Sequence, residues 1–463
     1  MSIKIKKTNM ANNDEESWIR KIVYNYYEKL KSYYEYKADL DAKYEDMRVQ
    51  SIDYMRGLLV ILSMFMINQG LENQISYAFQ NSKWNGMTLH DILVPMFLLV
   101  IGSSIPFYVK KHYEENEDIR HIVKMSFIKS IIVFVIGLIF SCIYYPANDY
   151  VRLTGPIQMM AFVYIMSLLL YIGFLKMRIK NNALTYIFIS MGIIVSIIFT
   201  AIGLAHSLKT GESSIFVVMD KALLSTFKSV SMADPEGILV CISGVSLGLI
   251  GLGLACILNK KPVENKRYIR YKRTSWVKES GYSRKNVLHD IKSWINPRSI
   301  KAILSNYYRI NLEARKLVDM LFIAILFYIV SKVMGIWLPL NRNILSLTFV
   351  LRVSSYFYFM MFVLYIICDI LAINFGTLLV KRLGLNSLAV IVITTVIYKL
   401  VNLITIKSIY TSTWLHFNNW FTVDFILPIF GSDYASGVYA AIITVIWILL
   451  GNLLHRFDIK LGL

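Results

Sequence analysis

Charged residues are scarce in this chain of 463 residues, since Asp, Glu, Lys and Arg together make up only 17% of it. A soluble globular protein usually carries about 25%. Hydrophobic residues reach 56%, mean hydropathy is +0.52, and apolar runs recur along almost the whole chain. Length alone would suggest about three soluble domains. The composition excludes them and indicates a membrane protein instead.

Cysteine is also rare, and several familiar motifs are missing. The four cysteines, Cys142, Cys241, Cys256 and Cys368, lie in or beside apolar runs, where a thiol usually acts as a small core hydrophobe. They predict neither a disulfide framework nor a metal site. The sequence has no P-loop, no dinucleotide fingerprint, no metal-ligand spacing and no cleavable signal peptide. We therefore expect no metal cofactor.

Apolar runs long enough to cross a bilayer dominate what is present. The core of a bilayer is ~30 Å thick and needs roughly 20 helical residues. Ten runs lie near residues 52–70, 91–109, 122–144, 156–175, 184–205, 237–258, 317–338, 344–368, 386–405 and 436–454. They are too long for strands and lack two-residue alternation. The sequence predicts an all-α polytopic membrane protein with about ten transmembrane helices.

Basic residues outnumber acidic ones, 49 to 30, and they are unevenly distributed. The connection 259–316 holds sixteen Lys and Arg against four acids, and residues 1–50 hold ten basic residues. Lys110 and Lys111 follow the second run, whereas Lys83 alone lies between the first and the second. Lys and Arg concentrate in cytoplasmic loops. Ten crossings therefore predict a multi-pass cell-membrane protein with both termini in the cytoplasm.

The same pattern divides the chain into four parts. They are a cytoplasmic amphipathic leader over 1–50, six helices over 51–258, a basic cytoplasmic connection over 259–316 and four helices over 317–463. The leader is either a helix on the inner leaflet or a solvated segment. Attraction to anionic membrane lipids explains the basic connection, so no nucleic-acid partner is expected. Contact with the phosphates of a cytosolic cofactor is the alternative.

The stretch 51–107 carries polar residues that a plain anchor helix does not need. Asp53 and Arg56 stand where the first run begins, and Asn68 stands near its far end. Trp84-Asn85-Gly86 occupies the loop before the second run. Because each polar group in hydrocarbon costs free energy unless it is partnered, we interpret this stretch as a working site between membrane helices.

Short motifs carry a resemblance to a known family. They are Ser51-Ile52-Asp53-Tyr54-Met55-Arg56-Gly57 with Asn68, Trp84-Asn85-Gly86-Met87-Thr88 with Asp91, Pro95, Phe97 and Gly102-Ser103-Ser104, Val151-Arg152-Leu153-Thr154-Gly155 with Gln158, Asp234-Pro235-Glu236-Gly237-Ile238-Leu239, Pro339-Leu340-Asn341-Arg342-Asn343 with Ser346-Leu347, and Gly384-Leu385-Asn386-Ser387. In these motifs the chain resembles the heparan-α-glucosaminide N-acetyltransferase family of transmembrane acyltransferases. The resemblance implies a transmembrane acyltransferase-like bundle. It also implies that acetyl from cytosolic acetyl-CoA passes to an amino sugar on the opposite face of the membrane. It does not cover the leader or the basic connection.

The chain departs from that family at positions that matter for chemistry. Family members carry a His three residues before the Trp of the Trp-Asn-Gly motif, as base or acyl carrier, and this position is Asn81 here. Met159 stands where an Arg often follows the Gln, and Thr394 where some members have His. Asn68 matches the family's Asn near the outer end of the first helix. Heparan specificity is therefore not carried over.

Acyl transfer requires removal of a proton, stabilisation of an oxyanion and alignment of the reactants. His90, at the mouth of the second helix, is the best candidate base, although Asp91 could orient it only if the backbone bends. The alternative is an interfacial His with no catalytic part. Asn68 either donates to the thioester oxygen or forms a helix–helix hydrogen bond. Asn81 cannot act as a base, but it can polarise a bound acyl group.

Four residues are candidates for binding the acyl-CoA donor. Asp53 and Arg56 share one helix face, which suggests that Arg56 binds a phosphate and Asp53 holds it in place. A purely structural ion pair is the alternative. Asn386 and Ser387 open the ninth predicted helix, where unpaired backbone N–H groups can accept phosphate.

Three residues of the loop before the second helix, Trp84, Asn85 and Asp91, are candidates for binding the acceptor. Trp84 can stack on a sugar face, and a belt Trp at the membrane interface is equally compatible. Arg352, about two turns inside the eighth run, is assigned no role beyond lining a polar cavity.

Together these residues favour an integral-membrane acyltransferase. It would move an acetyl group from cytosolic acetyl-CoA to an amine or hydroxyl of an extracytoplasmic glycan or lipid-linked sugar. Asn81 in place of His makes direct transfer the better hypothesis than a covalent intermediate. The alternative is a catalytically inactive transport or scaffold protein of the same architecture. The sequence does not identify the acceptor, the acyl chain or the oligomeric state, and a homodimer is one of the alternatives.

Overall fold

The computed structural model describes residues 49–71, 75–82, 84–114, 118–144, 153–177, 179, 181–204, 215–224, 236–260, 312–371 and 377–456. The predicted leader and most of the predicted basic connection lie outside the described residues. Within these ranges, nine helices are long and apolar enough to cross a membrane, or ten if one bent pair counts as a single span. The structure thus confirms an all-α protein with nine to ten candidate membrane spans.

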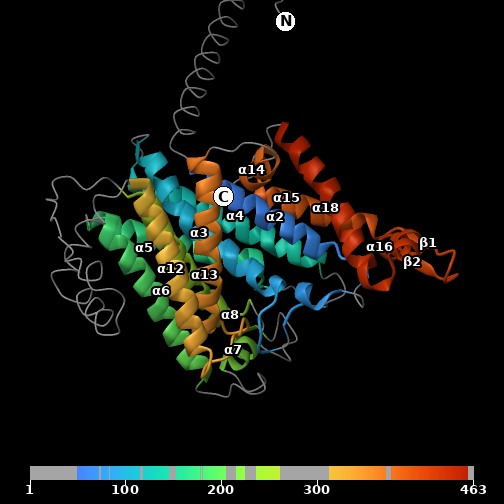
Figure 1. Ribbon diagram of the computed structural model, residues 1–463, viewed down its shortest axis with the longest axis horizontal. Helices are drawn as coiled ribbons and strands as arrows, with labels where there is room; N and C mark the ends of the chain where they lie inside the picture. Colours follow the sequence, from blue (N-terminus) through green and yellow to red (C-terminus); the bar gives the residue numbers. More distant parts are fainter. Residues whose placement is uncertain are drawn as a thin grey trace, which may run out of the picture. The chain divides into compact units, whose positions relative to one another are not determined.

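The candidate spans follow the predicted apolar runs (Figure 1). They are α2 (Gln50–Ile67), α3 (Leu89–Glu114), α4 (Ile119–Tyr144), α5 (Pro156–Lys176), α6 (Asn181–Leu204), α8 (Ile238–Leu258), α12 (Leu312–Met334), α13 (Leu347–Leu364) with its π-helical continuation η3 (Tyr365–Ile370), and α18 (Ser432–Arg456). A helix satisfies its own backbone hydrogen bonds, which is why unbroken apolar runs of this length adopt it in hydrocarbon. The shorter α7 (Ile215–Leu224) lies between α6 and α8 in the chain.

The ninth predicted run, 386–405, forms the single helix α15 (Ser387–Val401), which is shorter than predicted. It is preceded by α14 (Thr377–Leu385), and the two helices meet at a bend of 91°. The 15 residues of α15 rise only ~22 Å, less than the ~30 Å of a bilayer core. Gly384 allows α14 to touch α2, since a Cβ there would lie 1.9 Å from the Asp53 carbonyl oxygen. The pair is a broken or re-entrant span, and this corrects the prediction that 386–405 crosses the membrane as a helix by itself.

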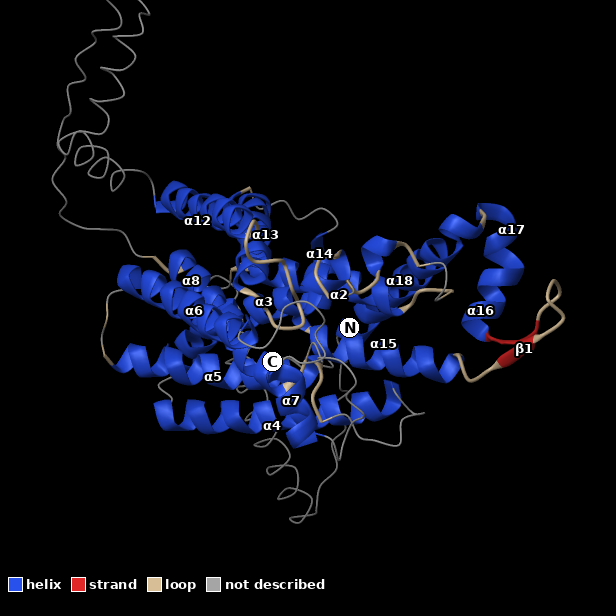
Figure 2. Ribbon diagram, turned by 90° about the horizontal axis from the view of Figure 1, so that it is seen from below, coloured by secondary structure: helices blue, strands red, loops and turns tan. Residues whose placement is uncertain are grey.

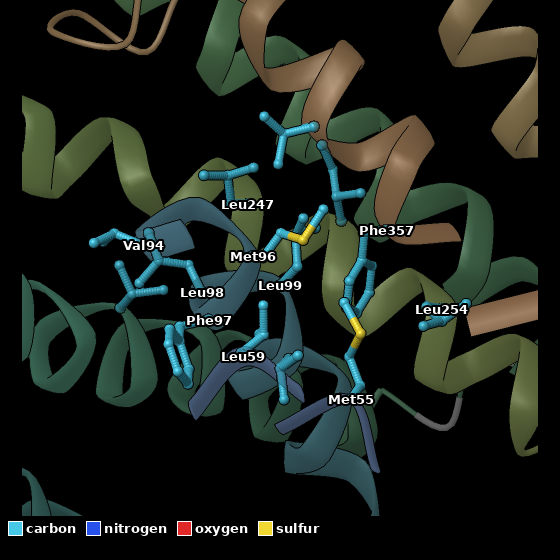
Figure 3. Close-up of a cluster of buried hydrophobic side chains, with 14 of the residues drawn as sticks. Met55, Leu59, Val94, Met96, Phe97, Leu98, Leu99, Leu247, Leu254 and Phe357 are labelled. Atoms are coloured by element: carbon cyan, nitrogen blue, oxygen red, sulfur yellow. The ribbon is translucent and has the colours of Figure 1, made fainter. Parts of the chain in front are cut away.

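The hydrophobic core lies around α8, which packs against α3, α5 and α6. Figure 3 shows Met55 and Leu59 of α2, Val94 and Met96 to Leu99 of α3, Leu247 and Leu254 of α8 and Phe357 of α13 gathered in this core. Glycine brings α3 and α8 close together, because a Cβ at Gly102 would lie 2.0 Å from the Gly248 carbonyl oxygen. Small residues are the usual means by which membrane helices approach this closely.

Three of the spans turn most of their surface outward. In each of α4, α6 and α12, only 28% of the most apolar 18-residue stretch is buried inside the protein. Figure 2 shows α4 and α12 at opposite edges of the helices drawn there. These outward surfaces are apolar, which suits contact with lipid chains.

A short segment with two strands and three short helices joins α15 to α18. The strands β1 (Thr405–Lys407) and β2 (Trp414–His416) pair antiparallel, and α16 (Phe417–Phe421), η4 (Thr422–Ile426) and α17 (Leu427–Phe430) follow them. Figure 2 shows β1, α16 and α17 together at one side of the long helices, and the Phe421 ring lies 6.1 Å from the ring of Tyr439 in α18. The Asp424 carboxylate accepts hydrogen bonds from Ser408 Oγ (2.6 Å) and Ile409 N (2.9 Å), which ties the hairpin to η4.

Asp369 of η3 holds the beginning of α2. Its carboxylate oxygens accept hydrogen bonds from the backbone N–H groups of Gln50 (2.8 Å) and Ser51 (3.0 Å). The first N–H groups of a helix have no partner within it, and a negative charge is favoured at that end. Asp369 therefore fixes the entry of the helix that carries Asp53 and Arg56.

Candidate active site

Arg342, in the loop between α12 and α13, joins two other segments. Its Nη1 donates to Asn81 Oδ1 (3.0 Å) and lies 3.8 Å from Asp91 Oδ1, and its Nη2 donates to Glu236 Oε1 (2.8 Å). We call Asn81, Asp91, Glu236 and Arg342 the Arg342 cluster. Its three charged members are only 6% (Arg342), 1% (Asp91) and 4% (Glu236) exposed. Because one guanidinium faces two carboxylates, these side chains hold a formal excess of one negative charge.

The beginning of α3 explains how Asp91 reaches this cluster. Thr88 and Asp91 form a capping box, in which Asp91 Oδ2 accepts from Thr88 N (2.9 Å) and Asp91 N donates to Thr88 Oγ1 (3.3 Å). The same carboxylate accepts from Ser82 N (3.2 Å). Asp91 thus starts the helix, orders the preceding loop and faces Arg342 at once, which limits its predicted role in binding an acceptor.

The Trp84-Asn85-Gly86 motif is tied to the loop that carries Arg342. Gly86 N donates to the Leu340 carbonyl oxygen (2.8 Å), and Asn341 Nδ2 donates to Asn85 Oδ1 (3.4 Å). The φ of Gly86 is 139°, a conformation that residues with a Cβ rarely adopt. Trp84 is half-buried and packs against the main hydrophobic core. Asn85 therefore lies close to the Arg342 cluster, and Trp84 anchors the loop.

His90, the predicted base, is the second residue of α3 and is half-buried. Its Nδ1 atom is enclosed and has no hydrogen-bond partner among the described residues. The Asp91 carboxylate accepts hydrogen bonds from the backbone N–H groups of Ser82 and Thr88, and no hydrogen bond joins it to His90 within the described residues. The orientation of His90 by Asp91 stays a prediction. A buried ring nitrogen without a partner is, however, available to a proton on a bound substrate.

Asn68 lies at the C-terminal cap of α2 and is 2% exposed. Its Nδ2 donates to the carbonyl oxygen of Met64 (2.6 Å), so its described hydrogen bond lies within its own helix rather than between helices. Its Oδ1 is buried without a partner among the described residues. The rings of Phe65 and Phe79, 5.0 Å apart, connect this end of α2 to the loop that leads to Asn81.

Arg56 is the centre of a second cluster of polar side chains, at a distance from the Arg342 cluster. Its Nη2 donates to Ser104 Oγ (2.5 Å) and its Nη1 lies 3.9 Å from Asp53 Oδ1. We call Asp53, Arg56 and Ser104 the Arg56 cluster. It combines the predicted ion pair within α2 with a hydroxyl of α3. Ser104 and Asp91 are thirteen residues apart on α3, so the two clusters are separated by ~20 Å along that helix.

Asn386 lies at the bend between α14 and α15, as the residue before the first turn of α15. It is 2% exposed, and both polar atoms of its side-chain amide are buried without a described partner. Ser387 is the first residue of α15. Since α14 and α15 both pack against α2, the structure brings Asn386 to the helix that carries Asp53 and Arg56.

Sequence reasoning did not select Arg342, Glu236 or Ser104 as site residues, although all three lie in the motifs that carry the family resemblance. Arg342 and Asn81 are 261 residues apart in the chain, and one sequence offers no signal for so distant a pair. The capping box at Thr88 and Asp91 was visible in the sequence as a Thr followed three residues later by an acid before an apolar run.

Comparisons with known proteins agree with the resemblance but cover little of the chain. No protein-family model matches it. It is 28% identical over 134 residues to heparan-alpha-glucosaminide N-acetyltransferase of Homo sapiens, and 26% identical over 133 residues to the enzyme of that name from Mus musculus. Each match covers 28% of this chain and 20% of the relative. The chain thus matches about a fifth of the length of these curated relatives, and the predicted resemblance is confirmed as distant and partial.

Proposed function

We propose that this chain is an integral-membrane acetyltransferase. It takes acetyl from acetyl-CoA and passes it to an amine of an extracytoplasmic glycan or lipid-linked sugar. The observation that carries the proposal is a pair of polar clusters, each with one member on α3, in a chain distantly similar to a membrane N-acetyltransferase. Acetyl-CoA has its nucleotide and its thioester at opposite ends of an extended molecule. Two separated polar sites within one bundle suit such a donor.

The Arg56 cluster and the bend at Asn386 would bind the nucleotide end. Arginine presents N–H groups in a fork that matches phosphate, and Asp53 and Ser104 hold Arg56 in place. The first N–H groups of α15 and the amide of Asn386 would add donors for further phosphate oxygens. Burying these groups without a ligand leaves the polar atoms of Asn386 unsatisfied, which is costly.

The Arg342 cluster and its surroundings would hold the reacting groups. The acceptor nitrogen attacks the thioester carbon, the C–N bond forms, the C–S bond breaks and the sulfur leaves as the CoA thiolate. His90 removes the proton from the amine and returns it to the thiolate. Asn68 has a second amide N–H, which would donate to the oxyanion.

Asn81 would polarise the acyl group rather than carry it. Its Oδ1 accepts from Arg342, which orients the amide and leaves its N–H groups for a carbonyl oxygen. Direct transfer fits this arrangement, because an amide cannot form the acyl intermediate that a histidine at this position could.

Replacement of Asn68 by Ala tests the proposal. Purified protein in detergent, given radiolabelled acetyl-CoA and glucosamine, is expected to release CoA and label the sugar. In Asn68→Ala the turnover should fall about 100-fold or more, because an oxyanion donor is lost. Asn452→Ala is the matched control, since Asn452 Nδ2 donates to the Ile448 carbonyl oxygen (2.8 Å) and its Oδ1 is likewise buried without a described partner. Equal turnover in both variants would contradict the assignment of Asn68.

An inactive transport or scaffold protein is the second candidate. The observation that favours it is Asn81, which stands at the family's His position and is engaged by Arg342. If wild-type protein neither binds nor hydrolyses acetyl-CoA in the assay above, this candidate replaces the enzyme.

We also propose that both termini lie in the cytoplasm, because Lys and Arg are concentrated in the N-terminal segment and in 259–316. Single cysteines at Lys83 and Lys285, in a background without the four native cysteines, should react differently with a membrane-impermeant maleimide on intact cells. Lys83→Cys is expected to be labelled from outside, and Lys285→Cys only after the membrane is opened. The reverse pattern would invert the topology and place the Arg342 cluster on the cytoplasmic side.

A further inference from the structure

Arg352 is a charged residue within a candidate membrane span that the proposed reaction does not use. It is 8% exposed, its Nε donates to Ser331 Oγ (3.1 Å), and its Cζ lies 4.8 Å from the centre of the Tyr328 ring. The predicted role of lining a polar cavity does not describe these contacts. Arg352 instead lies in the contact between α13 and α12, against a helix that turns outward.

Lys332 of α12 shares the aromatic ring that Arg352 approaches. Its Nζ lies 6.0 Å from the centre of the Tyr328 ring, and its side chain is exposed. Tyr328, Ser331 and Lys332 are three and four residues apart and so lie on one face of α12. Two cations and a tyrosine that is 40% exposed therefore converge on the outward side of the α12–α13 pair.

Arg352 and Lys332 differ in their partners from four other cations of the bundle. Arg56, Lys260, Lys316 and Arg342 each form an ion pair with an acidic residue. Within the described part of the chain, neither Arg352 nor Lys332 forms one, and the Nη atoms of Arg352 donate no hydrogen bond. Charged groups within a bilayer are almost always paired, and an anion from outside the chain would supply such a partner.

The depth of the pair indicates the source of that anion. Arg352 is the sixth residue of α13 and Lys332 is two residues from the end of α12, which places them ~8 Å and ~3 Å from the helix ends. Trp337, just beyond α12, is 76% exposed, as expected for an aromatic residue at the membrane interface. Around them the outward surface is apolar, with Ile325, Ile329 and Val333 all about half exposed.

We propose that Arg352 and Lys332 bind the phosphate of an anionic membrane lipid, whose acyl chains lie along the exposed apolar face of α12. Arginine and lysine both recognise phosphate, and Tyr328 holds the two cations at a fixed spacing through cation–π contacts. The site is separate from the Arg342 cluster and does not depend on catalysis.

Native mass spectrometry of the purified full chain with phosphatidylglycerol tests this site. Lys332→Gln and Arg352→Gln should each weaken lipid binding about tenfold, the effect of losing one charge-assisted hydrogen bond. Lys129→Gln is the matched control. Lys129 belongs to the outward helix α4, and its Nζ lies 4.6 Å from the centre of the Tyr108 ring and donates to the Tyr108 hydroxyl (3.2 Å). Wild-type lipid affinity in both test variants would overturn the proposal.

Two further comparisons keep the test decisive. Lys332 is exposed, so Lys332→Gln is expected to fold even if Arg352→Gln does not, and Arg352→Lys should retain most of the binding. Phosphatidylcholine, which carries no net charge, should bind at least tenfold more weakly than phosphatidylglycerol. If inorganic phosphate binds as tightly as the lipid, the site takes a free anion and the assignment to a lipid is wrong.

Discussion

His90→Gln is expected to reduce acetyl transfer by about 100-fold to 10,000-fold, the usual contribution of a general base. Glutamine keeps a polar group of similar size in place but cannot accept a proton. The enclosed Nδ1 of His90 has no described partner, so the loss would come from proton transfer rather than from a broken internal hydrogen bond. The measurement is the rate of CoA release with glucosamine as acceptor.

His416→Gln is the matched control for this experiment. Its Nδ1 lies 2.8 Å from the Asn402 carbonyl oxygen, and the residue is exposed at the end of β2. Its replacement should leave turnover unchanged. If His90→Gln also turns over at the wild-type rate, His90 is an interfacial residue without a catalytic part, and the proton must leave by another route.

Most of the helical architecture could be predicted from the sequence because composition alone determines it. An apolar run of about 20 residues has few alternatives to a membrane helix. The exception is the bend between α14 and α15, beside which Gly384 closely approaches the backbone of α2. That contact joins residues more than three hundred positions apart, and hydropathy carries no trace of it.

The candidate site was only partly predictable. The local pair of Asp53 and Arg56 followed from helical spacing, and the structure adds Ser104 from a neighbouring helix. Asp91 was selected for the acceptor, and its capping contacts with Thr88 show that it also has a structural task. The central cation, Arg342, could not be placed from sequence because its partners come from two distant segments.

Arg342→Met is expected to have the largest effect on stability. The variant leaves Asp91 and Glu236, 1% and 4% exposed, without the guanidinium that lies between them. Breaking a buried ion pair by removing one partner typically costs about 3–5 kcal/mol. Thermal unfolding in detergent should show a marked fall in midpoint. Arg56→Met provides the comparison, because Arg56 is 17% exposed and lies 3.9 Å from Asp53, so its loss should cost much less.

A double-mutant cycle separates the ion pair from simple loss of packing. In the variant that combines Arg342→Met with Glu236→Gln, one buried negative charge is removed together with the cation, so part of the lost stability should return. The coupling should be favourable, because the Nη2–Oε1 contact of 2.8 Å is a direct, buried hydrogen bond. Strictly additive effects would show that Arg342 stabilises the three segments by packing alone.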